Sequence, residues 1–274
     1  MKIALHVLWI SLLSFQVFAL DGKISEEKIE LYMELSGIEE IIDSMPVQID
    51  AMINQSLLTS KNPEIEKEVL QVLNYAWDFS AIKESIAGHI QKNSSNDEIT
   101  ELLKWQKSPL AIKITAEELE SSSPNFQSNL LRYIADLQVA PPPPETMQAV
   151  RRLVVATDMV NMMVEMIVDV TKAMTTTFMQ AASEKGDAGA IELDKKIDSM
   201  RAMLTPQMEQ QAILMSYYIY RNLSDEELDN YSSFYESNIG KRELTLVSES
   251  LNVAMSLWAK KSAIAIVEHM DNKR

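Results

Sequence analysis

One segment of this chain occurs twice in outline. The stretch "SNDEITELLKWQKSPLAIK" begins at Ser95, and "SDEELDNYSSFYESNIGKR", which aligns with it without a gap, begins at Ser224, 129 positions later. Each copy opens with a serine followed three residues later by a glutamate, the capping-box pattern that starts a helix. A repeat at such a long period predicts a fold built from two copies of one helical unit.

The repeat extends upstream, and a proline segment separates its copies. The stretch "ELYMELSGIEEII", from Glu30, aligns with "RRLVVATDMVNMM", from Arg151, and we expect the extra residues of the second copy in the loop 183–189. "APPPP" follows Val139, and consecutive prolines favour a stiff, extended spacer over a helix. An alternative interpretation is a proline-rich ligand for a partner.

The domain prediction follows from this boundary. We predict an N-terminal helical repeat over 20–139, a proline-rich linker over 140–145 and a C-terminal helical repeat over 146–274. Each half is expected to bury its own apolar interior.

The composition and the helix-start signals favour an all-α fold. Only six glycines occur, no stretch alternates convincingly as a strand would, and long segments lack turn signals. Capping boxes are expected at Ser95, Thr115 and Ser224, and a helix start is expected at Thr205-Pro206. The predicted fold is two repeat-related helical bundles joined by a proline linker.

The first residues have the layout of a secretory signal. "MKIALHVLWISLLSFQVFA" has one early lysine, an apolar stretch and a small residue at position 19, so we expect a signal peptide over 1–19. This predicts a location in the periplasm, or secretion, and no integral membrane segment in the mature chain. The absence of cysteine is compatible with export without disulfides. A net charge of −15 argues against nucleic-acid binding, because phosphates repel an acidic surface.

The second copy resembles a known bacterial family. The stretch "LSDEELDNYSSFYESNIGKRELTLVSESLN", from Leu223 to Asn252, is similar to exported proteins catalogued as domain of unknown function 2059, most clearly over 207–262. The residues that carry the resemblance are Phe234, Tyr235, Ser237, Gly240 and Lys241. The resemblance implies a helical fold, export and a gram-negative periplasm, and it supplies no catalytic residue.

The same motif is present in weaker form in the first copy, as Trp105, Ser108 and Pro109. Two positions depart from the family pattern: Asn238 stands where proline is common, and Ala111 stands in place of glycine. We expect a structural role, in which the serine caps the second helix and a small residue allows close approach. A recognition loop is the alternative.

No catalytic residue, cofactor or metal site is predicted. The mature chain has two histidines, His89 and His269, no cysteine, and no phosphate-binding or zinc motif. Paired acids such as Glu117-Glu118 could serve a hydrolase, but they fit helix starts or solvated helix faces better.

A methionine-rich helix is the most distinctive feature of the second half. Met159, Met162, Met163 and Met166 recur at helical spacing. Three hypotheses follow: core packing, a groove for an apolar ligand or a partner's hydrophobic segment, and a thioether site for Cu(I). Tyr217 and Tyr220 are candidates for the same groove.

The function predicted from the sequence is non-enzymatic. We expect an exported helical protein that binds an envelope protein or an apolar ligand. The alternatives are an envelope hydrolase that uses acidic residues and a methionine-based Cu(I)-binding protein.

Overall fold

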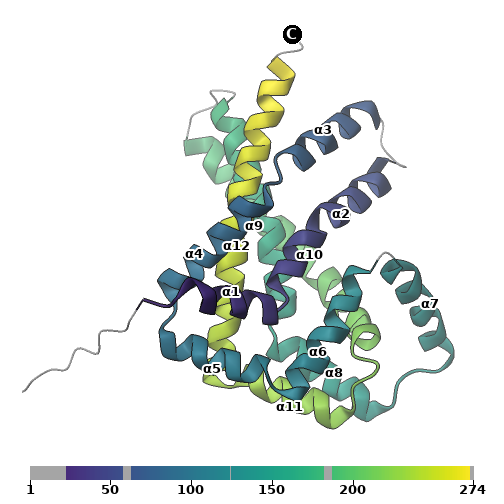
Figure 1. The fold of residues 1–274 in the computed structure, drawn as a ribbon. Coiled ribbons are helices and arrows are strands. Elements are labelled where there is room, and N and C mark those ends of the chain that lie inside the picture. The colour runs from purple at the N-terminus through teal and green to yellow at the C-terminus, as the bar shows by residue number, and fades with distance from the viewer. Residues whose placement is uncertain (1–22, 58–62, 124, 182–186, 272–274) are drawn as a thin grey trace, which may run out of the picture.

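The computed structural model describes residues 23–57, 63–123, 125–181 and 187–271, and this part of the chain contains twelve α-helices, a short 3-10 helix and no strand (Figure 1). The helices are α1 (Glu26–Leu35), α2 (Ile38–Leu57), α3 (Pro63–Tyr75), α4 (Phe79–Asn93), α5 (Asn96–Gln106), α6 (Pro109–Leu119), η1 (Glu120–Ser122), α7 (Phe126–Val139), α8 (Pro144–Ala156), α9 (Met159–Ala181), α10 (Asp187–Ile219), α11 (Asp225–Glu236) and α12 (Asn238–Asp271). The prediction of an all-α fold is confirmed.

Three sequence predictions concern segments at the edge of this description. The predicted signal peptide, 1–19, lies outside the described residues, as do residues 183–186 of the predicted loop. Residues 140–143 are non-helical and connect α7 to α8, and the division of the chain at this point stays a prediction. Within the described ranges, no helix is both long enough and apolar enough to span a bilayer.

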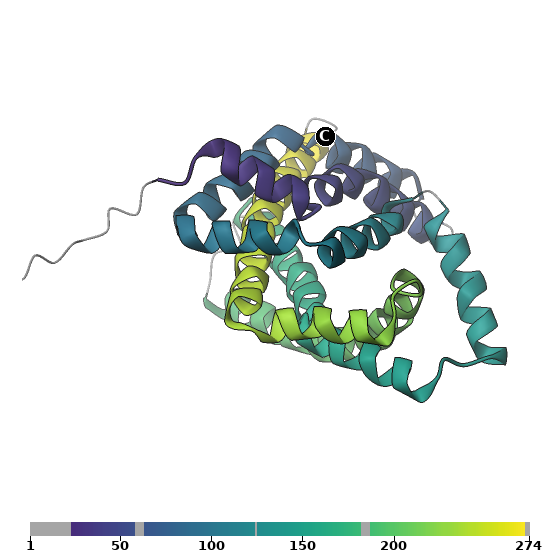
Figure 2. The same ribbon diagram turned by 60° about the horizontal axis from the view of Figure 1, so that its bottom comes forward.

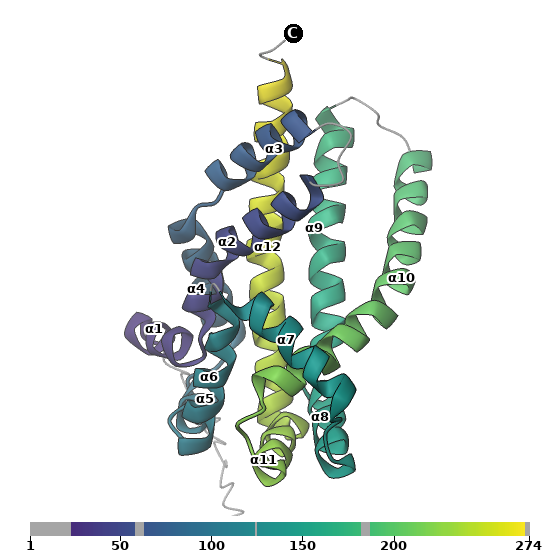
Figure 3. The same cartoon turned by 90° about the vertical axis from the view of Figure 1, so that its right-hand side faces the viewer.

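Helix α12 is the central element of the fold. It packs along α9 on one side and along α4 on the other, so that helices from both halves of the sequence share it (Figure 3). The largest apolar cluster accordingly joins buried residues of the first half, such as Ile86 and Leu102, to Leu246 and Trp258 of α12. The expectation that each half buries its own interior is therefore wrong, because α12 packs on α9 of its own half and also completes the core of the first half.

Two ion pairs connect the halves reciprocally. Arg242 in α12 binds Glu98 at 2.9 Å, and Lys113 in α6 binds Glu227 in α11 at 2.8 Å. Both pairs are partly exposed, so each contributes roughly 0–1 kcal/mol. Each of these glutamates is the third residue of its helix, counted after the capping serine, Ser95 or Ser224. The two predicted capping boxes are confirmed, because in each one the serine and the glutamate side chains both make their hydrogen bonds to backbone.

Aromatic residues at matched positions also meet. Trp105 in α5 and Phe234 in α11 occupy the same position in the two quoted segments, and their rings stack at 4.0 Å between centroids with 7° between planes. The turns upstream match as well: Gly37 (φ 72°) separates α1 from α2, and Asp158 (φ 50°) separates α8 from α9. These matches support the predicted internal repeat, which stays a prediction.

Two predicted helix starts are wrong. Thr115 lies inside α6, because Ser108 already caps that helix by accepting a hydrogen bond from the Ala111 amide at 3.2 Å. Thr205-Pro206 lies inside α10, where Thr205 Oγ1 instead donates to the Arg201 carbonyl at 2.8 Å. Proline there removes one hydrogen bond and bends the helix without ending it, and α10 changes direction along its length (Figure 3).

The motif turn between α11 and α12 has the structural role that the sequence predicted. Ser237 Oγ accepts a hydrogen bond from the Gly240 amide at 3.1 Å and so caps α12. A Cβ atom on Gly240 would lie 2.1 Å from the Phe234 carbonyl oxygen, which is a collision with backbone. The close approach is therefore to the end of α11, the helix that precedes the turn.

We expect Gly240→Ala to destabilise the protein by about 2 kcal/mol or more, because backbone must move to admit the methyl group. Gly88→Ala is the matched control, since a Cβ there meets nothing within 4 Å and Gly88 lies inside α4. That control should stabilise the protein by roughly 0.5–1 kcal/mol. Urea unfolding of both variants measures the difference, and equal stabilities would contradict the close approach.

We expect the stacked pair Trp105 and Phe234 to be energetically coupled. Alanine substitution of each residue and of both should give a coupling energy of about 0.5–1.5 kcal/mol in a double-mutant cycle. Trp105 and Trp258 form the control pair, because Trp258 stacks on Trp77 instead. Their effects should add to within about 0.5 kcal/mol. Additivity in the first cycle would show that the two halves are not joined by this stack.

Candidate functional site

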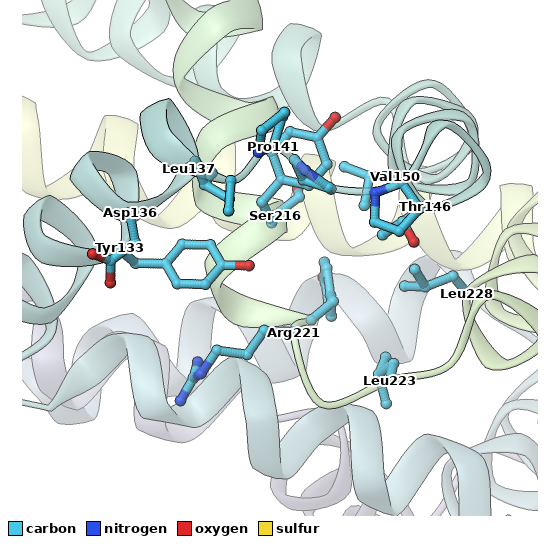
Figure 4. A pocket seen from close by; sticks show the side chains of 15 residues that line it. Tyr133, Asp136, Leu137, Pro141, Thr146, Val150, Ser216, Arg221, Leu223 and Leu228 are labelled. Atoms are coloured by element: carbon cyan, nitrogen blue, oxygen red, sulfur yellow. The ribbon is translucent and has the colours of Figure 1, made fainter.

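A pocket of about 440 Å³ lies where the end of α7, the proline segment 140–143, the start of α8 and the end of α10 meet (Figure 4). We call it the proline–tyrosine pocket after its apolar lining. This lining comprises Tyr133, Leu137, Ala140, Pro141, Pro142, Pro143, Val150, Tyr217, Tyr220, Leu223 and Leu228. The polar residues of the lining are Asp136, Thr146, Ser216 and Arg221. Its size falls in the range of about 300–1,000 Å³ that is usual for small-molecule sites.

Local sequence explains why the pocket forms here. Proline cannot continue a helix, so α7 ends before the proline segment, which connects it to α8. Pro143 directly precedes α8, and Pro144 occupies the first turn of that helix. The segment "SYYIY" at the end of α10 supplies bulky rings, with Tyr217 and Tyr220 lining the pocket. Tyr218, between them, turns to α7 and packs its ring edge-on against Tyr133 at 5.5 Å.

The pocket contains hydroxyl groups that have no hydrogen-bond partner among the described residues. Ser216 is 1% exposed, and its Oγ has no hydrogen-bond partner among the described residues. The hydroxyls of Tyr133 and Tyr217 likewise make no hydrogen bond within the described part of the chain, and burial raises the pKa of both. These hydroxyls therefore stay protonated at neutral pH.

The charged groups of the lining are largely committed elsewhere or exposed. The Arg221 guanidinium donates to Glu120 at 2.7 Å and to the Tyr218 carbonyl at 2.6 Å, and it lies 4.1 Å from the centre of the Tyr218 ring. Asp136 is exposed to solvent. The pocket thus presents an apolar wall, neutral hydroxyls and little free charge.

A network of acids and tyrosines, partly buried at Glu118 and fully buried at Glu243, lies beside the pocket and shares Tyr220 with it. Glu118 Oε1 accepts hydrogen bonds from Tyr220 at 2.7 Å and from Tyr231 at 2.8 Å. Enclosure of the carboxyl raises the pKa of Glu118, although the two hydrogen bonds oppose the shift. The burial of both tyrosines, and then the nearby Glu118 charge, raise the pKa of each hydroxyl.

The second acid of the network is Glu243 in α12, which is 2% exposed. Its Oε1 accepts from Tyr32 at 3.1 Å and from Gln106 at 2.8 Å, while its Oε2 has no partner among the described residues. The pKa of this carboxyl is raised to about 7, mainly by burial and in smaller part by the charge of Glu118, while the hydrogen bonds from Gln106 and Tyr32 oppose the shift. Glu243 can therefore hold a proton near neutral pH, but it does not line the pocket.

The four methionines predicted for a groove do not line the pocket. They lie along α9 and are half-buried, and the fully buried positions of that helix are Val164 and Val168. Met159 packs on the apolar cluster around the pocket, and Met166 packs on the cluster shared with α12. The hypothesis of a Cu(I) site stays a prediction.

The other predicted site residues divide between the pocket and the interface of the halves. Tyr217 and Tyr220 line the pocket. The motif residues Trp105 and Tyr235 pack on Tyr231, with ring centroids 6.4 Å and 5.1 Å from its own. Phe234 packs on Trp105 and Tyr235. The remaining motif residues occupy the turns: Ser108 and Pro109 begin α6, and Ser237, Gly240 and Lys241 begin α12.

Sequence reasoning missed Glu118, Glu243 and Ser216. Glu118 was interpreted as a capping residue, and its burial depends on tyrosines that are more than one hundred positions away. Glu243 follows two basic residues in an amphipathic segment, which resembles a solvated face. No group of His, Cys, Asp or Glu in the described residues has an arrangement suited to a metal ion.

Comparison with known proteins gives no match: no family model, curated protein or solved structure is similar to this chain at a significant level.

The buried Glu243 predicts a specific pH dependence of stability. Between about pH 4.5 and pH 7 the folded protein keeps a proton that the unfolded chain has lost, so the free energy of unfolding falls as the pH rises. The protonated Glu243 therefore contributes its full stabilisation of the folded protein below about pH 4.5, and this stabilisation has been lost above about pH 7. The free energy of unfolding changes by at most about 3 kcal/mol over this range. Glu118 acts in the same direction.

We expect Glu243→Gln to remove most of this slope and to exceed the wild type in stability at pH 8. The variant mimics the protonated acid and keeps an oxygen that accepts from Tyr32 and Gln106. Glu209→Gln, an exposed substitution on α10, is the control and should leave the slope unchanged. Urea unfolding at pH 5 and pH 8 measures it; an unchanged slope in Glu243→Gln would contradict the assignment.

Proposed function

We propose that this chain is a non-enzymatic, exported helical protein that binds a small apolar ligand in the proline–tyrosine pocket. The proposed location is the periplasm or the extracellular space, from the signal-like first residues. The proposed relationship to the family of domain of unknown function 2059 rests on the motif from Phe234 to Lys241.

The observation that carries the proposal is the composition of the pocket wall. Tyrosine rings, prolines and leucines surround about 440 Å³, and only four of the lining residues are polar, from α7, α8, α10 and the turn after α10. Such a wall gains free energy by burying apolar surface of a ligand, at roughly 25 cal/mol per Å². Rigid rings and prolines also lose little conformational entropy when a ligand binds.

Two features favour this proposal over a hydrolase. Glu118 and Glu243, whose pKa values are raised, face tyrosines or Gln106 rather than the pocket. Asp169, whose pKa is also raised by burial, lies in α9 and does not line the pocket. Asp136, the acid that does line the pocket, is exposed. A hydrolase would need acids that converge on the space a substrate occupies.

We expect the purified protein to bind the apolar fluorescent probe N-phenyl-1-naphthylamine saturably. Thr146→Trp, which fills the pocket from α8, should weaken binding by at least about tenfold, since the indole takes the place of the ligand. Gln148→Trp is the matched control, because it lies on the same helix, is exposed and does not line the pocket. Fluorescence titration measures affinity, and circular dichroism checks that both variants fold.

Absence of saturable binding to the wild type, or equal binding by Thr146→Trp and Gln148→Trp, would overturn the proposal. In the native compartment, mass spectrometry of the protein under non-denaturing conditions should detect a small molecule that copurifies with the wild type and is depleted in Thr146→Trp.

A further inference from the structure

Ser216 is an unsatisfied hydroxyl in the wall of the pocket. It is 1% exposed, lines the pocket, and its Oγ has no partner within the described residues. Two other buried serines are paired: Ser232 donates to the Leu228 carbonyl at 2.9 Å, and Ser250 donates to the Leu246 carbonyl at 2.6 Å. Ser262 in α12 also lacks a partner within the described residues, but it does not line the pocket. A buried hydroxyl without a partner is unfavourable in the empty pocket, and a ligand could satisfy it.

The framework does not require a hydroxyl at this position. In the alignment of the two halves, which are offset by 129 positions, Ser216 corresponds to Ala87 of the first half and Tyr217 corresponds to Gly88. Both pocket residues are therefore specific to the second half. The packing of the shared helix pattern works without them in the first half.

The surroundings of Ser216 select against a charged partner. Tyr133 and Tyr217 contribute two more neutral hydroxyls without partners within the described chain. Figure 4 shows Ser216 on the same side of the pocket as Pro141, with the ring of Tyr133 extending toward it. The guanidinium of Arg221 already binds Glu120 and the Tyr218 carbonyl, so it has little charge to offer an anion.

We propose that Ser216 is the polar anchor of the pocket, and that the ligand is an uncharged, largely apolar molecule carrying a hydroxyl or carbonyl group. This inference rests on the proposed function. The tyrosine rings and the prolines contact the apolar part of the ligand. Ser216 forms a hydrogen bond with its single polar group, and the hydroxyls of Tyr133 and Tyr217 belong to the same lining. An anion would lose its hydration on entry without gaining a free positive charge, and the carboxylate that a cation could meet in the lining, Asp136, is exposed to solvent and therefore attracts it only weakly.

The test uses four naphthalene compounds that differ in one substituent: 1-naphthalenemethanol, 1-methylnaphthalene, 1-naphthoate and 1-naphthylmethylammonium. Each displaces N-phenyl-1-naphthylamine from the wild-type protein in a fluorescence competition. The alcohol should bind more tightly than the anion and the cation. Ser216→Ala should weaken the alcohol about threefold to tenfold, the loss of one hydrogen bond, and leave methylnaphthalene unchanged.

Ser216→Ala should also raise the thermal midpoint of the ligand-free protein, because it removes an unsatisfied buried hydroxyl. Ser262→Ala is the matched control: Ser262 is 0% exposed, its Oγ also lacks a partner within the described chain, and it lies in α12 away from the pocket lining. That control should be stabilised in the same way while its affinity for the alcohol stays at the wild-type value. A merely structural role for Ser216 would give the two variants the same binding.

The outcomes separate this inference from the function on which it rests. Tighter binding of the anion or the cation, or unchanged affinity of Ser216→Ala for the alcohol, would overturn the anchor while binding of apolar probes persists. Failure of every naphthalene compound and of the fluorescent probe to bind the wild type would overturn the proposed function itself.

Discussion

The fold depends on the packing of α12 across both halves of the sequence. Trp258, Ala259 and Ala263 are buried on this helix, and Trp258 stacks edge-on against Trp77 of the first half at 5.5 Å. The Trp258 indole also donates to the Leu73 carbonyl at 3.3 Å. A chain without cysteine has no covalent cross-link, so this shared apolar surface supplies the main force that holds the halves together.

That arrangement also accounts for the surroundings of the buried Glu243 and the partly buried Glu118. Where α12 begins, it passes over α5 and brings Glu243 against Tyr32 and Gln106, both from the first half. Where α6 passes α11, Glu118 is brought against Tyr220 and Tyr231, both from the second half. Each acid therefore lies in a surrounding that the other half provides, which is costly for a charge and favourable for a proton. The network makes the interface sensitive to pH near neutrality while it keeps the polar groups largely paired.

Local signals in the sequence predicted the elements better than the way they pack. Ser95 and Ser224 marked real helix starts, because a capping box satisfies backbone donors within four residues and needs no distant partner. Thr115 carried the same pattern and failed, because a helix had already begun at Pro109 and its hydrogen bonds left no ends to cap. At Pro206 the sequence indicated a break, and the aligned position in the first half does fall in the break between α3 and α4. In the second half, packing keeps the helix continuous through the proline.

The candidate site could be predicted only in part, for the same reason. Tyr217 and Tyr220 were predicted for a groove shared with the methionines, but the pocket that they line contains no methionine and depends on the proline segment and on α7, whose approach no local pattern encodes. The helical spacing of the methionines predicted a groove, but in the structure these residues pack on different apolar clusters: Met159 on the cluster around the pocket and Met166 on the cluster shared with α12. Burial of Glu243 and Ser216 is a property of the assembled helices, and side-chain type alone gives no sign of it.

A comparison of the two halves gives a physical reason for the pocket. Along α4 the space is filled by α12, which buries Trp258 and Ile266 there. The aligned place along the end of α10 is covered by α7, which follows the interruption at η1 and stands at the outer edge of the molecule (Figures 1 and 2). Only Leu130 of α7 is buried, and Val139 at its end is 87% exposed. The long helix α12 thus closes the first half into a packed core. In the second half, the interruption at η1 and the proline segment place α7 so that the proline–tyrosine pocket remains beside the end of α10.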